Sequence, residues 1–525
     1  MSPPGDIVGA VTTGYQAWFT CEGDGSEAQC IGGWWHYSPD RLKLCGPDNC
    51  GIISWPDMRP YEKTYPTAHG VQADGAQPSL FSNMDDCTIL THFRMMADAG
   101  IDTAALQRFN PTGGEGPIRN VTTPRVARAA EATGRKWYCM YDISGWANMQ
   151  SELKTDWLSI MSAFACGPSY ARQNGRAVVS IWGFGFNDDG HKWDPAACIE
   201  IINWFKSQGC YVIGGVPTWW REGKSDSRDN YAQVYRTLDC ISPWMVGRAG
   251  KIRDLDNMYE AANLPDAKEL ASLGIDYQPC VMPGDLRAGD RYHGDFYWRH
   301  WYNSVRLKET GVGLGIYISM FDEYNEGNQI APTAETKANQ PPEFPHNALD
   351  EDGVACTSDY YLRITRDARE MFQGRAEVTK VRPTEPWPGR GRFNPLPFVG
   401  LRARVNGKIV CAEGGGGHPL FANRDNVGPW EQFELEYESP TCAAIKTKSG
   451  QYVCAEPHVD GQPDFTLVAN RPGAGPWETF EVEQQGGGVI ALKAHNGKYV
   501  QATGDGPLVA KSDAVGWWET FEVVE

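Results

Sequence analysis

The sequence predicts an α/β protein made of a (β/α)8 TIM barrel that is followed by a smaller all-β domain. Three observations carry this prediction. Eight short apolar runs alternate with amphipathic segments up to about residue 380, a Pro- and Arg-rich stretch then interrupts the pattern, and a unit that occurs three times fills the rest of the chain. A chain of 525 residues also exceeds what one ordinary hydrophobic core can hold.

The eight apolar runs are predicted to be barrel strands, because most of them are rich in Val, Ile or Ala near the start and carry polar, Gly or Trp residues near the end. They are residues 7–19, 102–109, 136–145, 177–185, 211–220, 240–247, 275–284 and 312–321. Segments between them, such as 151–166 and 195–208, carry apolar residues at helical spacing. The long segment from about residue 20 to 85 is rich in Trp, Gly, Pro and Cys, and we expect it to shape the barrel mouth.

The predicted domains are therefore a catalytic barrel over residues 1–380, a Pro-rich linker or docking strap over 381–398, and a repeat domain over 399–525. In the repeat domain, related hexapeptides start at residues 408, 451 and 498, and Gly-(Pro/Trp)-Trp-Glu-(Gln/Thr)-Phe closes each copy. Each copy reads as short strands joined by Asn-Gly or Ser-Gly turns. Three such units that close together predict a β-trefoil.

The repeat pattern resembles the fascin-like trefoil from Leu401 to Glu525. The repeated Trp and Phe positions are then expected to form the core, and a ligand is expected in variable loops such as 414–419 and 456–463. The repeated aromatic positions are Trp430, Trp477, Trp518, Phe433, Phe480 and Phe521.

Composition narrows the function. Acidic residues outnumber basic ones by 66 to 48, which gives a net charge of -18 and disfavours nucleic acid as a partner. The chain also has 20 Trp and 22 Tyr, and such rings stack well on the apolar faces of sugars as well as packing in cores.

The 15 cysteines are many for a reducing compartment, so we expect disulfides at the close pairs Cys21/Cys30 and Cys45/Cys50. This favours secretion. No signal-peptide pattern follows Met1, and we expect that a leader has been removed before it. No apolar run reaches 18 residues, so we expect no membrane span.

The strongest chemical signal lies directly after the eighth predicted strand. Asp322, Glu323 and Glu326 place three carboxylates within five residues, on the loop where barrel enzymes keep their catalysts. Crowded carboxylates cannot all ionise at their usual pKa, so one can hold a proton while another stays a base. A solvated acidic loop or a calcium site would also fit the composition, although the run lacks the ligand spacing of an EF-hand.

The segment EYNEGNQI at residues 323–330 resembles the catalytic signature of glycoside hydrolase family 99, the endo-α-mannosidases and endo-α-mannanases. GYQAWF at Gly14, LFSNMD at Leu80 and WGFGF at Trp182 look like the barrel of the broader family 99-like group. The resemblance covers most of residues 7–375. It implies a retaining mechanism in which the 2-hydroxyl of the sugar is the nucleophile and a 1,2-anhydro sugar is the intermediate.

The resemblance also assigns roles to the two glutamates. Glu323 matches the general base that removes the 2-hydroxyl proton, and Glu326 matches the group that protonates the leaving oxygen and later activates water. Two neighbours depart from the mannosidase pattern, because Asn325 stands where a His is usual and Ala331 where an acid is usual. The departure leaves the identity of the sugar open.

Polar and aromatic residues at other strand ends are the candidate sugar contacts, and each would equally serve as a structural plug or an ion-pair partner. No His pair has the spacing of a catalytic zinc site, so we expect no metal and no cofactor. The candidate substrate-binding residues are Gln107, Arg108, Asp142, Asn187, Trp219, Arg291 and Tyr324.

The sequence thus predicts an exported retaining glycoside hydrolase that cleaves an α-linked oligo- or polysaccharide, mannan-type first, with no nucleic acid or membrane partner. The trefoil is expected to bind or dock on a glycan. The alternatives are a family 71-like α-1,3-glucanase or another polysaccharide hydrolase, a non-catalytic glycan-binding protein, and a fascin-like cytoskeletal binder.

Overall fold

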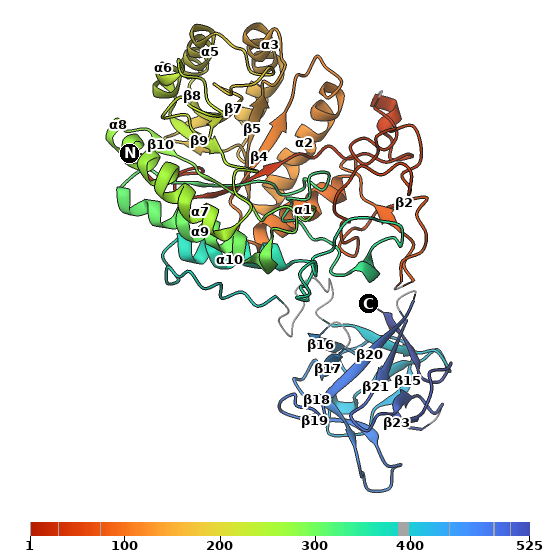
Figure 1. The fold of residues 1–525 in the computed structure, drawn as a ribbon. Helices are drawn as coiled ribbons and strands as arrows, with labels where there is room; N and C mark the ends of the chain where they lie inside the picture. The colour runs from red at the N-terminus through yellow and green to blue at the C-terminus, as the bar shows by residue number, and fades with distance from the viewer. Residues whose placement is uncertain are drawn as a thin grey trace.

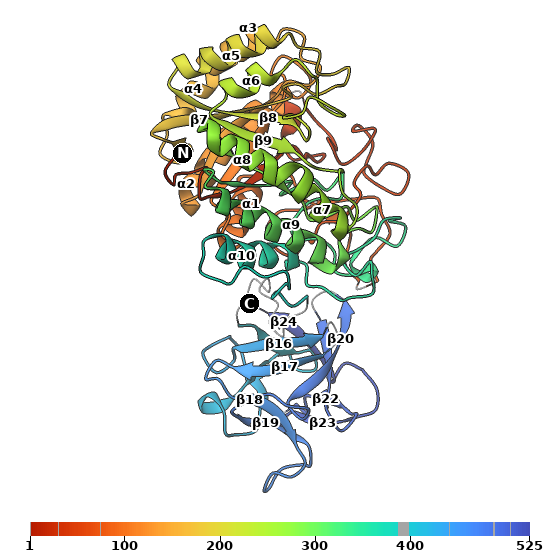
Figure 2. The ribbon, with the colours of Figure 1, turned by 60° about the vertical axis from the view of Figure 1, so that its left-hand side comes forward.

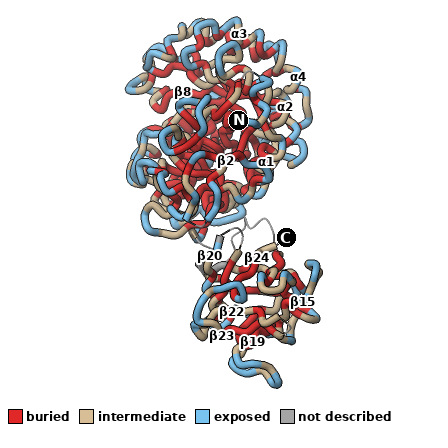
Figure 3. Tube along the Cα trace, turned by 90° about the vertical axis from the view of Figure 1, so that its right-hand side faces the viewer, coloured by how far each residue is buried: buried red, intermediate tan, exposed pale blue. Residues whose placement is uncertain are grey.

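The computed structural model describes residues 2–29, 31–73, 75–386, 398–439, 442–486, 489–504 and 506–524. Two large hydrophobic cores divide these residues, one formed between Ile7 and Phe372 and the other between Val399 and Phe521, and a small third cluster joins Leu255, Met282 and Phe296. Figure 1 shows the first as an α/β domain and the second as an antiparallel β domain. Figure 3 shows that buried residues are concentrated inside both.

The α/β domain is built on a parallel sheet whose strands follow the order β10-β9-β8-β7-β5-β4-β1-β12-β11. β10 and β11 are two halves of one segment, and they pair with β9 and β12 respectively, so the sheet returns on itself as in a TIM barrel. Every predicted strand region contains a strand. The strands are β1 (Val11–Tyr15), β4 (Thr103–Arg108), β5 (Lys136–Asp142), β7 (Arg176–Trp182), β8 (Cys210–Pro217), β9 (Cys240–Trp244), β10 (Asp276–Tyr277), β11 (Cys280–Val281) and β12 (Ile316–Ile318).

Helices follow the strands and cover the outside of the sheet (Figure 2). They begin and end where the local sequence dictates: Asp194 caps α5 by accepting from the Ala196 amide at 2.9 Å, and Gly134 ends α2 at a φ of 66°. The helices are α1 (Asp86–Asp98), α2 (Gly116–Thr133), α3 (Met149–Asp156), α4 (Ser162–Ala165), α5 (Pro195–Ser207), α6 (Ala232–Thr237), α7 (Ile252–Met258), α8 (Leu264–Leu273), α9 (Asp295–Arg306) and α10 (Tyr360–Phe372).

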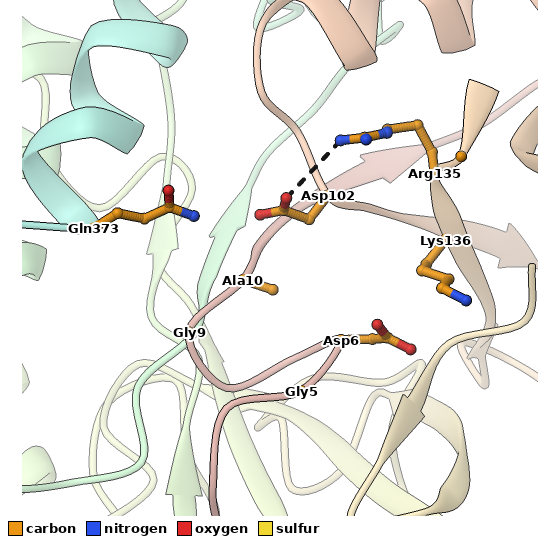
Figure 4. A pocket seen from close by; sticks show the side chains of 9 residues that line it. Gly5, Asp6, Gly9, Ala10, Asp102, Arg135, Lys136 and Gln373 are labelled. Carbon is orange, nitrogen blue, oxygen red and sulfur yellow. Dashed lines mark ion pairs between the residues drawn. The ribbon is translucent and has the colours of Figure 1, made fainter. Parts of the chain in front are cut away.

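A shallow pocket lies at the N-terminal ends of β1, β4 and β5 (Figure 4). Asp102 accepts from the Val11 amide at 3.0 Å and pairs with Arg369 at 2.7 Å, and Arg135 lies 3.9 Å away. This is the end of the barrel that serves stability in TIM-barrel enzymes, whereas the carboxylates of the 322–326 segment lie at the opposite ends of the strands. We therefore assign this pocket a structural role.

The insertion between β1 and α1 carries little regular structure beyond the short strands β2 (Tyr65–Pro66) and β3 (Ser79–Leu80). A buried histidine fastens it to the barrel: the ring nitrogens of His92 lie 2.8 Å from the hydroxyls of Tyr15 and Tyr61. Burial lowers the pKa of His92 to about 3, so this ring is neutral and serves as a hydrogen-bonding bridge.

The C-terminal domain is entirely antiparallel and repeats one four-stranded unit three times. In each unit two strands join a ring and the two between them form a hairpin, and the ring is closed by the pairing of β13 with β24 and a bridge from Val399 to Phe433. The strands are β13 (Gly400–Ala403), β14 (Ile409–Cys411), β15 (Phe421–Arg424), β16 (Phe433–Ser439), β17 (Cys442–Thr447), β18 (Tyr452–Glu456), β19 (Thr466–Arg471), β20 (Thr479–Gly486), β21 (Val489–Lys493), β22 (Tyr499–Gln501), β23 (Val509–Ser512) and β24 (Thr520–Val524).

The prediction that the repeated Trp residues belong to the core is wrong, whereas the prediction for the repeated Phe residues is confirmed. The repeated phenylalanines are fully buried, but Trp430, Trp477 and Trp518 are 46%, 48% and 49% exposed. The reason lies in the adjoining glutamate, which turns inward: Glu431 and Glu478 each accept from the amide of the glycine three residues before, at 2.9 Å. The repeated motif is thus a capped turn that presents its Trp outward.

Two further sequence predictions concern the cysteines and the linker. Within the described residues Cys45 and Cys50 carry free thiols, so their predicted disulfide is not formed, and Cys21 is also free while Cys30 lies outside those residues. Residues 381–386 lie along the barrel, where Arg363 donates to the carbonyls of Glu385 and Pro386 at 2.8 Å. The remaining predicted linker, residues 387–397, lies outside the described residues.

None of the helices within the described ranges combines the length and apolar character that a bilayer span requires.

The different environments of the two repeated aromatics give the first prediction. Phe480→Ala is expected to destabilise the β domain by about 3–5 kcal/mol, because a fully buried ring is lost and a cavity remains. Trp477→Ala is the matched control and is expected to cost far less, since half of that ring already faces solvent. Urea unfolding of the full chain measures both; equal losses would contradict the burial of one and exposure of the other.

Candidate active site

The acidic segment 322–326 follows β12, at the C-terminal end of the barrel strands. Its chain reverses sharply, because the amides of Glu326 and Gly327 both donate to the carbonyl of Glu323 at 3.2 Å, and Gly327 adopts a φ of 77° that favours glycine. Asp322 and Glu323 are buried, whereas Glu326 is exposed. The turn therefore places two neighbouring glutamates in different surroundings.

Asp322 fastens this segment to the end of β1. Its carboxylate accepts from the backbone amides of Gln16 and Ala17 at 2.8 and 2.9 Å. Ala17 adopts a φ of 49°, a left-handed conformation that is costly for a non-glycine residue and brings both amides to one carboxylate. Burial raises the pKa of Asp322 to about 6.

Glu323 lies beside this anchor. Its Oε1 accepts from Nε2 of Gln16 at 2.9 Å. Burial, together with the charge of Glu326, raises the pKa of Glu323 from 4.5 to about 8. Gln16 acts in the opposite direction, because its hydrogen bond favours the ionised form.

The pKa of Glu326 is raised as well, but by other neighbours. Partial desolvation raises it most, the nearby Arg287 lowers it, and Asp285 raises it. The pair therefore consists of one buried and one exposed carboxyl with unlike proton affinities, an arrangement that suits acid–base chemistry.

Gln16 is a site residue that the sequence reasoning missed. Its carbonyl accepts a hydrogen bond from Arg119, a fully buried residue whose guanidinium lies 5.3 Å from the ring centre of Trp18 and 4.8 Å from that of Phe109. Its position could have indicated its role, because Gln16 directly follows β1 and the predicted sugar contacts were chosen at the ends of the other strands.

Three predicted sugar contacts have side chains occupied by protein partners. Arg108 forms an ion pair with Asp156 at 2.5 Å, and Nη2 of Arg291 donates to the carbonyls of Gly327 and Gln329 at 2.8 Å. The Tyr324 hydroxyl donates to the carbonyl of Pro332 at 2.9 Å. Arg291 and Tyr324 thus hold the acidic segment in place, and we leave all three out of the proposed sugar site.

The other predicted contacts remain at the ends of β4, β5, β7 and β8. Gln107 is buried with its Nε2 4.0 Å from Sδ of Met320, and Oδ1 of Asp142 accepts from the Ser144 amide at 2.8 Å. Asn187 is exposed, and Trp219 is half-buried. All four residues lie at or beyond the C-terminal ends of their strands.

Further aromatic residues that the sequence analysis did not select lie at the same end. Trp182 ends β7 and Trp244 ends β9; both are half-buried, and their rings lie 5.6 Å apart at an interplanar angle of 79°. His191 bridges the Ser144 hydroxyl at 2.9 Å and Asp188 at 2.7 Å. Aromatic faces beside polar groups are the usual composition of a sugar-binding surface.

Comparisons with known proteins bear on the two domains separately. A family model described as a domain of unknown function, DUF7910, matches residues 398–524. No curated protein matches the chain.

Solved structures match the α/β domain. Two structures of the GH99 endo-α-mannosidase from Bacteroides thetaiotaomicron are 17% and 16% identical to the chain, with TM-scores of 0.49 and 0.50, the second in complex with bis-tris-propane. The matches cover 70% and 71% of this chain and 98% and 100% of the matched chains. The α/β domain therefore has a GH99-like fold.

A designed three-fold symmetric protein, ThreeFoil, is 19% identical to the chain, with a TM-score of 0.22. The match covers 25% of this chain and 99% of ThreeFoil.

The raised pKa of Glu323 predicts how stability depends on pH. The folded state keeps a proton on Glu323 up to about pH 8, whereas the unfolded chain releases it near pH 4.5, so this residue makes unfolding easier as pH rises through that window. Glu323→Gln removes the effect. The variant is therefore expected to gain stability relative to the wild type between pH 5 and pH 8, by roughly a few kcal/mol.

Urea unfolding at several pH values measures this difference, and Glu309→Gln on the exposed surface is the matched control. A constant difference between wild type and Glu323→Gln across the window would contradict the raised pKa.

Proposed function

We propose that this protein is a retaining glycoside hydrolase of α-linked glycans, with mannan-type polysaccharides as the first substrate class. The observation that carries the proposal is the buried Glu323 beside the exposed Glu326, directly after the last strand of a barrel with a GH99-like fold. Export and the division into domains at residues 380 and 399 remain predictions.

In the proposed mechanism Glu323 removes the proton from the 2-hydroxyl of the sugar. The freed oxygen attacks C1, the bond from C1 to the leaving oxygen breaks, and Glu326 donates its proton to that oxygen. Glu326 then takes a proton from water, which opens the 1,2-anhydro ring at C1, and Glu323 returns its proton to the 2-oxygen. Two displacements at C1 retain its configuration, and both glutamates end as they began.

Two contacts support the proposed roles. A base must be ionised, which burial of Glu323 disfavours, and the hydrogen bond from Gln16 partly offsets that effect, while Asp322 fixes the backbone beside it. Glu326 is exposed, as a group that meets both a leaving oxygen and a water molecule must be. We propose Gln107, Asp142, Asn187 and Trp219 as sugar contacts, together with Trp182 and Trp244.

We also propose that the β domain is a fascin-like β-trefoil that docks on a glycan. The supporting observations are its threefold strand pattern and the outward-facing Trp of each repeated turn. Trp477 stacks on the ring of His495 with centroids 4.9 Å apart and an interplanar angle of 4°, which leaves a flat exposed face for a sugar.

Release of products from a panel of α-mannans and α-glucans tests the catalytic proposal. Glu323→Gln and Glu326→Gln are each expected to lose about 10²–10⁴-fold in kcat, because each removes one proton-transfer group. Glu309→Gln is expected to act like wild type. Unchanged turnover in either active-site variant would remove its proposed role, and no turnover by wild type on any glycan would favour a binding protein.

The dependence of kcat/KM on pH tests whether Glu323 is one of the two proton-transfer groups. The reactive form combines an ionised Glu323 with a protonated Glu326, so kcat/KM is expected to fall on both sides of an optimum, and its upper limb, set by the higher of the two pKa values, is expected near pH 8. Gln16→Leu deletes the hydrogen bond that favours the carboxylate of Glu323, and this upper limb is expected to move to higher pH. A wild-type profile without a limb near pH 8, or an upper limb that Gln16→Leu leaves in place, would contradict the assignment.

A further inference from the structure

A second cluster of reactive side chains lies in the insertion between β1 and α1, away from the acidic segment. Sγ of Cys45, Sγ of Cys50 and a ring nitrogen of His69 all lie within 4.8 Å of one another. Tetrahedral zinc, with bonds of about 2.3 Å to sulfur and 2.0 Å to nitrogen, separates its ligand atoms by about 3.5–3.8 Å. The cluster therefore has the donor set and nearly the dimensions of a zinc site.

His69 provides an independent observation. Its side chain is 1% exposed, yet neither ring nitrogen has a hydrogen-bond partner among the described residues. Trp55 packs edge-on against the ring with centroids 5.3 Å apart. Burying an imidazole whose nitrogens make no hydrogen bond is costly, and a cation bound to one nitrogen would remove that cost.

The surrounding backbone holds the three side chains in position. The amide of Ala68 donates to the carbonyl of Cys45 at 2.8 Å, which ties the His69 segment to the first cysteine. The four residues between the cysteines form a turn closed by the Asn49 amide on the Gly46 carbonyl at 2.9 Å. The site is thus built from contacts that do not depend on a bond between the two thiols.

A carboxylate completes the environment. Oε2 of Glu343 lies 3.8 Å from Nδ1 of His69, and such a partner orients a histidine that binds metal through its other nitrogen.

We propose that Cys45, Cys50 and Nε2 of His69 bind a zinc ion, with an exchangeable ligand in the fourth position. The two sulfur donors favour zinc over hard cations such as calcium or magnesium. Glu343 acts as a positioning residue.

The zinc ion has a structural consequence for the acidic segment. Three residues beyond Cys50, the amide of Ile53 donates to the carbonyl of Tyr324 at 2.8 Å, and the amide of Asp57 donates to Pro332 at 3.0 Å. The metal would thus fix the segment of the insertion from Cys50 to Asp57, which lies against residues 322–334. This role is independent of the proposed hydrolase reaction.

Metal analysis of the full-length protein tests the proposal. The protein is purified under reducing conditions, incubated with zinc chloride, desalted and measured by mass spectrometry for bound zinc. Wild type is expected to retain stoichiometric zinc. Cys50→Ser and His69→Ala are expected to lose at least about tenfold in zinc affinity, and Cys166→Ser, an exposed free thiol elsewhere, is the matched control.

Cobalt provides a readout that does not depend on the folding of any variant. Cobalt-loaded wild type is expected to show the intense visible absorption of tetrahedral coordination and a thiolate charge-transfer band in the ultraviolet. Absence of these bands, a peptide mass that shows a Cys45–Cys50 disulfide in protein purified under reducing conditions, or full zinc retention by His69→Ala would each overturn the proposal.

Discussion

The contact on which the acidic site depends is the one between Asp322 and the backbone that leaves β1. One carboxylate accepts from two consecutive amides, and it ties the end of the first barrel strand to the segment that follows the last. The contact also places the Gln16 side chain on Glu323. Because hydrogen bonds to charged groups are short and strong, one anchor fixes both the position of Glu323 and its principal polar partner.

The same segment is held from two other directions. Arg291 binds the carbonyls on the far side of the turn, and the insertion supplies backbone amides that meet Tyr324 and Pro332. With these supports in place, Glu323 is buried while Glu326 reaches the surface. Both carboxyls, with unlike proton affinities, therefore come from the one loop that follows β12. The proposed acid and base do not come from two different strands.

Much of this arrangement could be predicted from the sequence. The strands were predictable because buried parallel strands read as short apolar runs, and the placement of the two glutamates at the C-terminal end of the barrel was predictable because they follow the eighth run. The role of Gln16 could not be predicted, because it depends on a contact between residues about 300 positions apart in the sequence. The repetition of Trp430, Trp477 and Trp518 indicated a shared turn but did not indicate whether these side chains are buried. Likewise, the spacing of Cys45 and Cys50 suited a disulfide, and only the fold brings His69 beside them.

The proposed chemistry requires Glu323 and Glu326 to be a pair of unequal acids in one site. Nuclear magnetic resonance of protein with ¹³C-labelled glutamate carboxyls measures this difference directly, with Glu323→Gln and Glu326→Gln used to assign the signals. Glu323 is expected to titrate near pH 8, and to titrate at lower pH in Glu326→Gln because a neighbouring negative charge is gone. Titration of Glu323 near pH 4.5, unaffected by the Glu326 substitution, would contradict it.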